Sequence, residues 1–234
     1  MSSLEATDNE QFSTRDYWDR RYTDLKEGED TFDWFKTYDD LKPIFDELIP
    51  SKEARILMLG CGNSTLSGDM YASGYERITN LDYSAPLIES MKRKHDARGQ
   101  TRMKWLVMDV TQMTSDDNPA ALCSTHEHDE EEKEGRGKGE GTWDVAIDKG
   151  TMDAFMAEKG SVWDPSPRVR ALVKGEVDGV LRLLKPGGLF IYLTFGQPHF
   201  RRPLLERPDE WDIEVKTIGD MFHYYLYVCR KRSV

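Results

Sequence analysis

The segment from Arg55 to Ser64, Arg-Ile-Leu-Met-Leu-Gly-Cys-Gly-Asn-Ser, constrains the fold more than any other stretch of this chain. Its first five residues, four of which are apolar, predict a strand that is buried on both faces, as in a parallel sheet. Gly60 and Gly62 then allow the chain to turn sharply and to bring its backbone close to a ligand. Residues 63–65 can cap a following helix. A strand, a glycine turn and a helix form the first half of a nucleotide-binding crossover.

Carboxylates at later strand ends strengthen this interpretation, because a Gly-x-Gly turn by itself also occurs without any ligand. Asp82 ends a second apolar run about twenty residues further on, where nucleotide-binding folds place an acid for the ribose hydroxyls. Two more strand candidates end in the same way, at Asp109 and at Asp148. One such acid could be a helix cap, but three in successive strands are hard to explain by capping alone. Ligands of open α/β sheets lie beyond the carboxyl ends of the strands, so we expect these acids to share a site.

Strand and helix signals alternate along most of the chain. The expected strands are residues 55–59, 78–81, 103–108, 143–147, 189–194, 211–217 and 223–230. The longer expected helices are residues 84–98 and 168–184, and residues 185–188 are expected to form a turn. This alternation predicts a single α/β domain over residues 51–234. Its fold would be a Rossmann-like seven-stranded sheet, mostly parallel with an antiparallel edge strand, and with helices on both faces.

The N-terminal part of the chain has a different pattern. We expect residues 1–13 to be disordered and residues 14–50 to form a helical segment that is rich in aromatic side chains. Trp18, Tyr22 and Trp34 belong to this segment. These rings are either core residues or a lid over a flat heterocycle, and the usual burial of aromatic side chains favours the core.

Residues 115–141 interrupt the domain with a strongly charged run that begins His-Glu-His-Asp-Glu-Glu-Glu at His126. Such a run cannot bury enough surface to offset the entropy of ordering, so we predict a disordered insertion. His126 and His128 could be metal ligands, but a solvated charged loop explains them better because nothing fixes their geometry. We therefore expect no metal site.

Composition excludes several classes of partner. The 234 residues carry a formal net charge of −11, which argues against nucleic-acid phosphates as the main partner. The sequence has no apolar run of membrane-spanning length, and its N-terminus is polar and acidic, so we expect neither a membrane partner nor a secretory leader. Three widely spaced cysteines, Cys61, Cys123 and Cys229, suggest a reducing compartment. We expect a cytoplasmic monomer.

The strand-end acids also distinguish between two kinds of nucleotide-like ligand. A dinucleotide would favour a third glycine at the position of Thr65, and its pyrophosphate would be repelled by nearby carboxylates. S-adenosyl-L-methionine carries no phosphate and fits better. Asp82 can accept hydrogen bonds from both ribose hydroxyls, and Asp109 can accept one from the adenine amine. Asp148 would then face the methionine amino group or the incoming nucleophile.

Several motifs resemble those of one protein family. They are Tyr-Trp-Asp-Arg-Arg-Tyr (17–22), Asp-Trp-Phe (33–35), Leu-Gly-Cys-Gly-Asn-Ser (59–64), Asp-Tyr-Ser (82–84), Met-Asp-Val (108–110), Asp-Lys-Gly-Thr-Met-Asp-Ala (148–154), Pro-Gly-Gly (186–188) and Pro-His-Phe-Arg (198–201). On these motifs the chain resembles the class I seven-stranded S-adenosylmethionine-dependent methyltransferases. More closely, it resembles the elongation factor 1-alpha lysine methyltransferase family of the endothelin-converting-enzyme-2-associated type. The Gly-x-Gly and Pro-Gly-Gly motifs are shared by most methyltransferases, whereas the longer motifs at 59–64 and 149–154 are specific to this subgroup.

The resemblance implies an enzyme that uses S-adenosyl-L-methionine, releases S-adenosyl-L-homocysteine and methylates lysine on a protein such as translation elongation factor 1-alpha. It implies cofactor contacts from Trp18, Tyr22, Trp34, Gly60, Asp82, Tyr83, Asp109, Val110 and Lys149, to which the arguments above add Gly62 and Asp148. It also favours the lid over the core for the aromatic rings, because a sulfonium cation and a flat adenine suit an aromatic cover. The chain departs from the family in its acidic insertion and at Asp148, where a relative carries the longer Glu.

The chemistry of the acceptor points to further candidates. A lysine must lose its proton before it attacks a methyl group, because an ammonium has no free lone pair. We expect Asp148 and Asp153 to position the amine or relay its proton, although Asp153 could equally cap a helix. His199, Phe200 and His223 are candidates for the substrate rim, with ordinary packing as the alternative. Two other functions stay open, a small-molecule or N-terminal amine methyltransferase and a cofactor-binding scaffold without catalysis.

Overall fold

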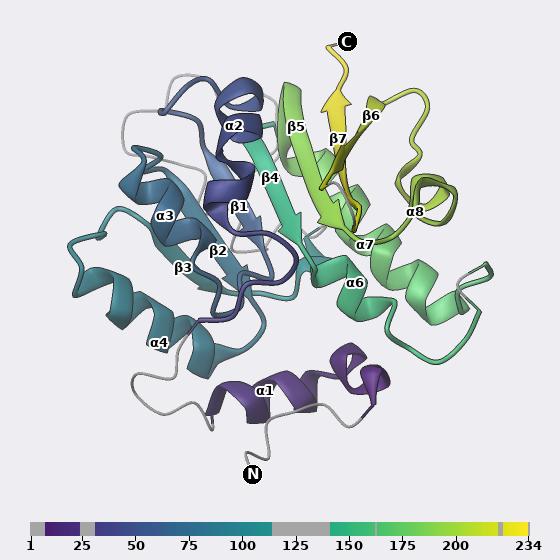
Figure 1. Cartoon of the computed structure of the whole chain (residues 1–234), viewed down its shortest axis with the longest axis horizontal. Helices are drawn as coiled ribbons and strands as arrows, with labels where there is room; N and C mark the ends of the chain where they lie inside the picture. Colours follow the sequence, from purple (N-terminus) through teal and green to yellow (C-terminus); the bar gives the residue numbers. More distant parts are fainter. Residues whose placement is uncertain (1–7, 24–30, 114–140, 162, 220–221, 234) are drawn as a thin grey trace.

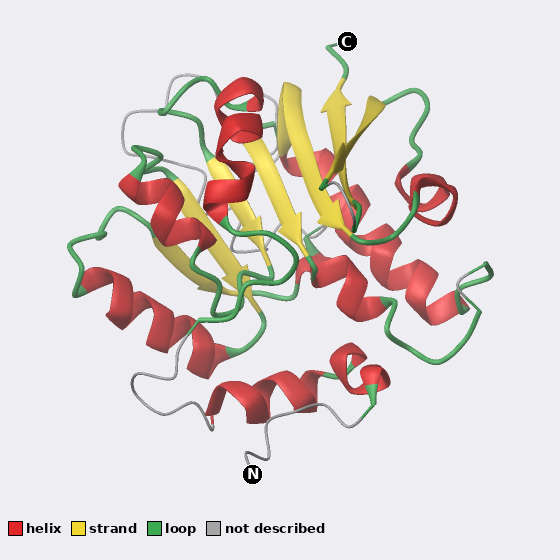
Figure 2. Cartoon of the chain, in the orientation of Figure 1, coloured by secondary structure: helices red, strands yellow, loops and turns green. Residues whose placement is uncertain are grey.

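A computed structural model describes residues 8–23, 31–113, 141–161, 163–219 and 222–233 (Figure 1). The strands are β1 (Ile56–Leu59), β2 (Ile78–Asp82), β3 (Lys104–Val107), β4 (Trp143–Lys149), β5 (Leu184–Thr194), β6 (Trp211–Ile218) and β7 (Tyr224–Lys231). The α-helices are α1 (Arg15–Thr23), α2 (Tyr38–Leu48), α3 (Leu66–Ala72), α4 (Ala85–Asp96), α6 (Thr151–Phe155), α7 (Pro167–Leu183) and α8 (Pro198–Leu205). Two short 3-10 helices are η1 (Asn9–Ser13) and η2 (Val110–Gln112). Within these residues a sheet lies between two layers of helices (Figure 2).

The sheet has seven strands in the order β3-β2-β1-β4-β5-β7-β6. Strands β1 to β5 pair in parallel, and β7 pairs antiparallel with both β5 and β6. The predicted fold class is therefore confirmed, with the reversed strand lying one place in from the edge. Parallel pairing brings the carboxyl ends of β1 to β5 to one edge of the sheet, and Figure 1 shows α1 lying across this edge.

Both faces of the sheet are buried, as the continuous apolar runs predict. In β1, Ile56 and Met58 pack in a core with α2, α3 and α4, whereas Leu57 and Leu59 pack in a second core with α7. This division follows from the alternation of side chains along a strand. It fastens the glycine turn after Leu59 to a strand that is immobilised on both sides.

The helical segment expected over residues 14–50 divides into two parts. Helix α2 is a core helix, because Tyr38, Leu41 and Phe45 are buried against the sheet. Helix α1 instead lies at the carboxyl edge of the strands (Figure 1). We expected residues 1–13 to be disordered; residues 1–7 lie outside the described residues, but Asn9–Ser13 form η1. The reason for this difference is Phe12, whose ring packs against those of Tyr17, Trp18 and Trp34.

Other departures from the sequence predictions are local. The turn expected at residues 185–188 is part of β5, which shifts its register against β4 there and has φ +77° at Gly187. Helix α8 was not predicted, although Pro198 stands in its first turn, where proline is favoured. The insertion expected at residues 115–141 lies outside the described residues apart from Gly141, and so do His126 and His128. No helix within the described parts of the chain is long and apolar enough to cross a membrane.

Candidate active site

A pocket opens at the carboxyl edge of the sheet, between the strand ends and α1. Its lining comes from the glycine turn, from the ends of β2, β3 and β4, and from the aromatic N-terminal segment. The residues predicted to contact the cofactor that line it are Trp18, Tyr22, Trp34, Gly60, Gly62, Asp82, Tyr83, Asp109, Val110 and Lys149. Of the predicted set, Asp148 alone is not among the lining residues.

The glycine turn requires glycine at both positions. Gly60 has φ +56° and Gly62 has φ +52°, in the left-handed region that other residues rarely adopt. A Cβ on Gly60 would collide with the side chain of Thr151, and one on Gly62 would lie 3.1 Å from the Tyr22 hydroxyl. The Thr151 hydroxyl donates a hydrogen bond of 2.9 Å to the carbonyl of Leu59. The turn is therefore packed between Thr151 on one side and Tyr22 of α1 on the other.

Asp82 is the buried carboxylate at the centre of the pocket. Its Oδ2 accepts a hydrogen bond from the Gly62 N–H at 3.1 Å, and its Oδ1 accepts one from the Ser84 N–H at 3.0 Å. Burial raises the pKa of Asp82 to about 6, and these two backbone bonds oppose that rise. A carboxylate oxygen has two lone pairs, so each oxygen can still accept from a ligand. Asp82 therefore holds the glycine turn by a hydrogen bond and also lines the pocket.

Asp109 and Tyr83 form the far end of the pocket, toward β3. The Oδ1 of Asp109 accepts hydrogen bonds from the Thr111 N–H at 2.9 Å and the Thr111 hydroxyl at 2.7 Å, which caps η2. Tyr83 contacts Arg15 of α1, whose Nη2 donates to the Tyr83 carbonyl at 3.0 Å and whose guanidinium lies 5.3 Å from the centroid of the Tyr83 ring. We predicted no role for Arg15, which links α1 to the end of β2.

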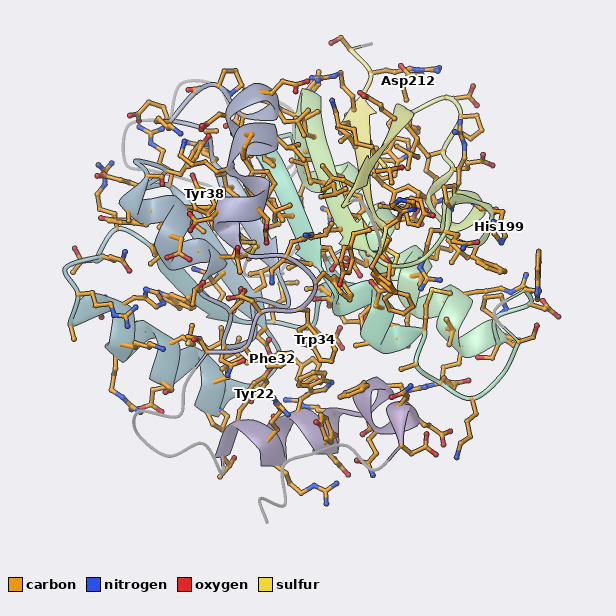
Figure 3. The ribbon with its side chains drawn as sticks, viewed as in Figure 1. Tyr22, Phe32, Trp34, Tyr38, His199 and Asp212 are labelled. Atoms are coloured by element: carbon orange, nitrogen blue, oxygen red, sulfur yellow. The ribbon has the colours of Figure 1, made fainter. Side chains whose placement is uncertain are left out.

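Aromatic side chains cover the pocket opposite the strand ends. Trp18 stacks on Tyr22 with ring centroids 5.7 Å apart, and Trp34 meets Phe12 and Phe32 edge to face at 5.3 and 5.0 Å. Figure 3 shows Tyr22, Phe32 and Trp34 gathered between α1 and the strand ends. All of these rings line the pocket, and Tyr22 also packs against the edge of the sheet core. Phe12 was missed because it lies in the stretch expected to be disordered, and Phe32 was not singled out from the aromatic residues around it.

Lys149 fastens the segment before α2 to the end of β4. Its ammonium lies 2.9 Å from Asp33 Oδ1 and donates a 3.0 Å hydrogen bond to the carbonyl of Trp34. Asp33 also accepts from the hydroxyls of Ser64 and Thr65, which lie just before α3. Burial raises the pKa of Asp33, but the Ser64 hydrogen bond and the Lys149 charge outweigh it and lower the pKa overall. Burial lowers the pKa of Lys149, and the Asp33 charge opposes this. Asp33 lies in a motif noted above, but no role was predicted for it.

The backbone is strained at Phe35, beside this ion pair. Phe35 has φ +67°, which is rare for a bulky residue, and the Lys36 N–H donates to the Trp34 carbonyl at 2.8 Å, which closes a γ-turn around it. Such a conformation costs roughly 1–3 kcal/mol and persists only where the surroundings hold it. The Lys149 hydrogen bond to the same Trp34 carbonyl provides that support. The γ-turn directs the adjacent Trp34 and Phe35 rings to different neighbours.

Asp148 lies behind the residues that line the pocket. Its carboxylate is fully buried and accepts the N–H groups of Thr151 at 2.8 Å and Met152 at 2.9 Å. Burial raises the pKa of both Asp148 and its neighbour Glu176. No donor among the described residues reaches the Glu176 oxygens. Burial raises the pKa of Glu176 well above its ordinary value, and the Asp148 charge raises it further, which favours the protonated acid as the hydrogen-bond donor of this pair. The pair supports the start of α6 from behind the pocket.

Asp153 also faces away from the pocket. Its carboxylate accepts from the Thr194 hydroxyl at 2.6 Å, the Tyr192 hydroxyl at 3.0 Å and Arg201 Nη2 at 3.0 Å. Both Asp153 and Arg201 are almost completely buried in this ion pair. The network joins α6 to β5 and α8, and Asp153 is not among the residues that line the pocket.

The three predicted rim residues do not line the pocket. His199 and Phe200 lie on α8, where their ring centroids are 5.2 and 4.6 Å from that of Trp163, and Figure 3 places His199 well away from Tyr22 and Trp34. His223 is exposed just before β7. Within the described parts of the chain, no group of three or more His, Cys, Asp or Glu side chains is placed to hold a metal ion.

Comparison with known proteins identifies the family. Residues 56–134 match the family described as "Methyltransferase domain". The chain is 31% identical over 225 residues to the EEF1A lysine methyltransferase 4 of Mus musculus, and the match covers 95% of this chain and 77% of the mouse protein. The chain belongs to this methyltransferase family. It is an S-adenosylmethionine-dependent methyltransferase, as the motifs predicted.

The chain is also similar to one part of a larger protein and, in its fold, to solved methyltransferase structures. The chain is 34% identical over 206 residues to the eEF1A lysine and N-terminal methyltransferase homolog of Drosophila melanogaster, which covers 88% of this chain but 26% of the fly protein. A SAM-dependent methyltransferase from Methanosarcina mazei superposes with a TM-score of 0.51 at 16% identity, over 82% of this chain and 98% of the other. At that identity the similarity shows a common fold only.

Proposed function

We propose that this methyltransferase modifies a lysine side chain of a protein, and that elongation factor 1-alpha is the substrate. The observation that supports this most strongly is the match to EEF1A lysine methyltransferase 4, because it extends over 95% of this chain, including the aromatic segment before the sheet. We also place the enzyme in the cytoplasm, where an elongation factor works. Unpaired, buried Cys61 and Cys229 agree with a reducing compartment.

The pocket residues fit the cofactor part by part. The Asp82 carboxylate would accept the ribose hydroxyls, since each of its oxygens keeps a lone pair beside its backbone bond. Asp109 would accept from the adenine amine, with the Tyr83 ring beside it. The methionine end would lie at the glycine turn and Lys149, which line the same pocket. Trp18 and Trp34 would cover a sulfonium cation with aromatic faces.

Methyl transfer requires little covalent chemistry from the protein. When bound, S-adenosyl-L-methionine supplies an activated methyl group to a nucleophile held in line with it. The aromatic lid excludes water from the reacting atoms. The acceptor lysine must arrive neutral, and desolvation beside a sulfonium charge lowers its pKa. Among the described residues that line the pocket, the carboxylates are Asp82 and Asp109, which serve the adenosine end. We therefore assign deprotonation to desolvation and loss of the proton to water, instead of to Asp148 or Asp153.

The test is transfer of label from radioactive S-adenosyl-L-methionine to purified elongation factor 1-alpha, followed by mass spectrometry of the labelled peptide. The expected product carries methyl groups on a lysine ε-amine. The matched control is Asp82→Ala, which should bind S-adenosyl-L-homocysteine weakly and transfer no label. Label on the N-terminal α-amine would instead indicate N-terminal methylation, the second activity in the name of the fly relative. Label only in small molecules of a cell lysate would refute a protein substrate.

A further inference from the structure

Exposed aromatic rings gather beside the pocket at its β4 end. Phe195 follows β5 and Phe222 precedes β7, and their exposed fractions are 51% and 65%. Because β7 runs antiparallel to β5, with Tyr225 opposite Thr194, both residues lie at the edge of the sheet where the pocket opens. Together with Phe35 and Tyr224 they form a surface that we call the aromatic ledge.

The ledge is continuous with the lid of the pocket. Trp34 lines the pocket, and its ring centroid is 6.2 Å from that of Phe35. The Phe35 ring in turn lies 5.7 Å from Phe195 and 5.6 Å from Tyr224, and Phe222 lies 5.2 Å from Tyr224. The strained γ-turn at Phe35 is what lets two neighbouring residues serve both the pocket and the ledge.

The ledge also lies at the end of the pocket where the acceptor would enter. A Cβ on Gly150 would lie 3.4 Å from the Phe35 ring and 3.6 Å from Trp34 Cβ, so both residues lie close to Gly150. Gly150 and Lys149 end the pocket on the side away from Asp109. If the adenine lies at Asp109, as the proposed function requires, the transferable methyl group lies toward Gly150 and the ledge.

The chemistry of the ledge suits a lysine-bearing segment. The Lys36 ammonium lies 5.6 Å from the centroid of the Tyr224 ring, so Tyr224 already has a cation on its face and the exposed rings of Phe195 and Phe222 are left for a partner. Aromatic rings of this kind also anchor apolar side chains at protein interfaces. The chain carries a net charge of −11, which favours a basic partner.

We propose that the aromatic ledge docks the polypeptide segment that carries the acceptor lysine. The occupant is a segment of the folded protein substrate, with an apolar side chain on the exposed rings of Phe195 and Phe222 and its lysine directed past Phe35 into the pocket. The ledge, and not the cofactor pocket, then selects which lysine is methylated. This inference rests on the proposed function and deepens it.

The experiment compares the full-length enzyme with the double variant Phe195→Ala/Phe222→Ala. Both side chains are exposed, so truncation leaves no core cavity. Purified elongation factor 1-alpha is the acceptor, and S-adenosyl-L-homocysteine affinity is measured by calorimetry. We expect kcat/KM for the protein to fall about tenfold or more, the loss typical of interface anchors, while the Kd of S-adenosyl-L-homocysteine stays within about twofold. Phe195→Tyr, which keeps the ring, should retain most of the activity.

The matched control is Trp163→Ala, which removes another exposed ring, 75% accessible, from the patch beside α8. We expect it to leave kcat/KM unchanged. An unchanged kcat/KM in the double variant, or an equal loss in Trp163→Ala, would overturn the ledge as the docking surface. A photo-crosslinking phenylalanine analogue at position 195 should capture a peptide adjacent to the methylated lysine, and capture of a remote peptide would also overturn it. If the wild-type enzyme labels no protein at all, the proposed function itself fails.

Discussion

Lowering the pH should weaken cofactor binding through Asp82. Burial raises the pKa of this carboxyl from 3.8 to about 6, and a ligand hydroxyl donates to the carboxylate but not to the proton-bearing oxygen of the acid. With a pKa near 6 the ionised fraction is about nine-tenths at pH 7 and about one-tenth at pH 5. Apparent affinity scales with the binding-competent fraction, so the Kd of S-adenosyl-L-homocysteine should rise about tenfold over this interval.

The assay is calorimetric titration with S-adenosyl-L-homocysteine at pH 5, 6, 7 and 8, and the control is Asp82→Asn. The amide cannot ionise, so the variant should bind weakly at every pH. The expected loss at pH 7 is about 2–4 kcal/mol, the value of one or two hydrogen bonds to a charged group. Subtracting its profile removes any titration of the product itself. A wild-type Kd that stays flat from pH 7 to pH 5, or the same pH dependence in Asp82→Asn, would refute the assignment of the ribose to Asp82.

Asp82 has the opposite effect on the unliganded protein. Its pKa is higher in the folded chain than in the unfolded one, so the folded state binds more protons between pH 3.8 and about 6. The contribution of Asp82 to the free energy of unfolding therefore falls as the pH rises through that window. A ligand that donates hydrogen bonds to the ionised carboxylate stabilises the folded protein and so offsets this fall in the free energy of unfolding. The ligand therefore stabilises the ionised form of Asp82.

Three further substitutions test the rest of the site. Burial raises the pKa of Glu176 above its ordinary value of 4.5, so the folded state keeps this proton as the pH rises above 4.5 and the free energy of unfolding declines there. Glu176→Gln should make that decline shallower by up to about 1.4 kcal/mol per pH unit, and an unchanged slope in urea denaturation would contradict this. Asp33→Asn should lower the free energy of unfolding by about 3–5 kcal/mol, because it leaves the buried Lys149 ammonium without its counter-charge. Adding Lys149→Met to this variant should recover part of the loss, and purely additive losses from the two substitutions would count against the ion pair. Gly60→Ala should abolish S-adenosyl-L-homocysteine binding, because φ +56° and the Thr151 side chain exclude a Cβ, and full binding in calorimetry would show that the turn tolerates one.

Local patterns along the chain were enough to predict the frame of the site. Continuous apolar runs indicated strands buried on both faces, and Gly60 and Asp82 followed two of them. Parallel pairing brings the carboxyl ends of such strands together: Met58 lies opposite Asn80, and Leu59 lies opposite Asp148. The glycine turn and the strand-end acids therefore share one edge of the sheet for a reason that is readable from short segments. Seven of the predicted cofactor contacts line one pocket on this account, and the other three, Trp18, Tyr22 and Trp34, come from the N-terminal segment.

The direction of single side chains depended on packing that no local pattern contains. Asp148 and Lys149 are neighbours near the end of β4, yet consecutive side chains of a strand point to opposite sides, and only Lys149 lines the pocket. Asp148 faces Glu176 of α7 instead, which is distant in the sequence. Likewise, Asp153 is held by Arg201 of α8, a helix that sequence analysis did not predict.

The division of the aromatic residues between core and lid was also a matter of tertiary structure. Tyr38 of α2 belongs to the sheet core, whereas Trp18 and Trp34 line the pocket, although all three lie in one aromatic segment. The γ-turn at Phe35 depends on Lys149, which is 114 residues away in the sequence. Burial and strain are properties of the assembled chain, because they depend on which distant segments exclude water from a side chain or hold it in place. The residue types alone set the chemistry that was possible, and the packing of the sheet with α1 and α7 selected the side chains that could perform it.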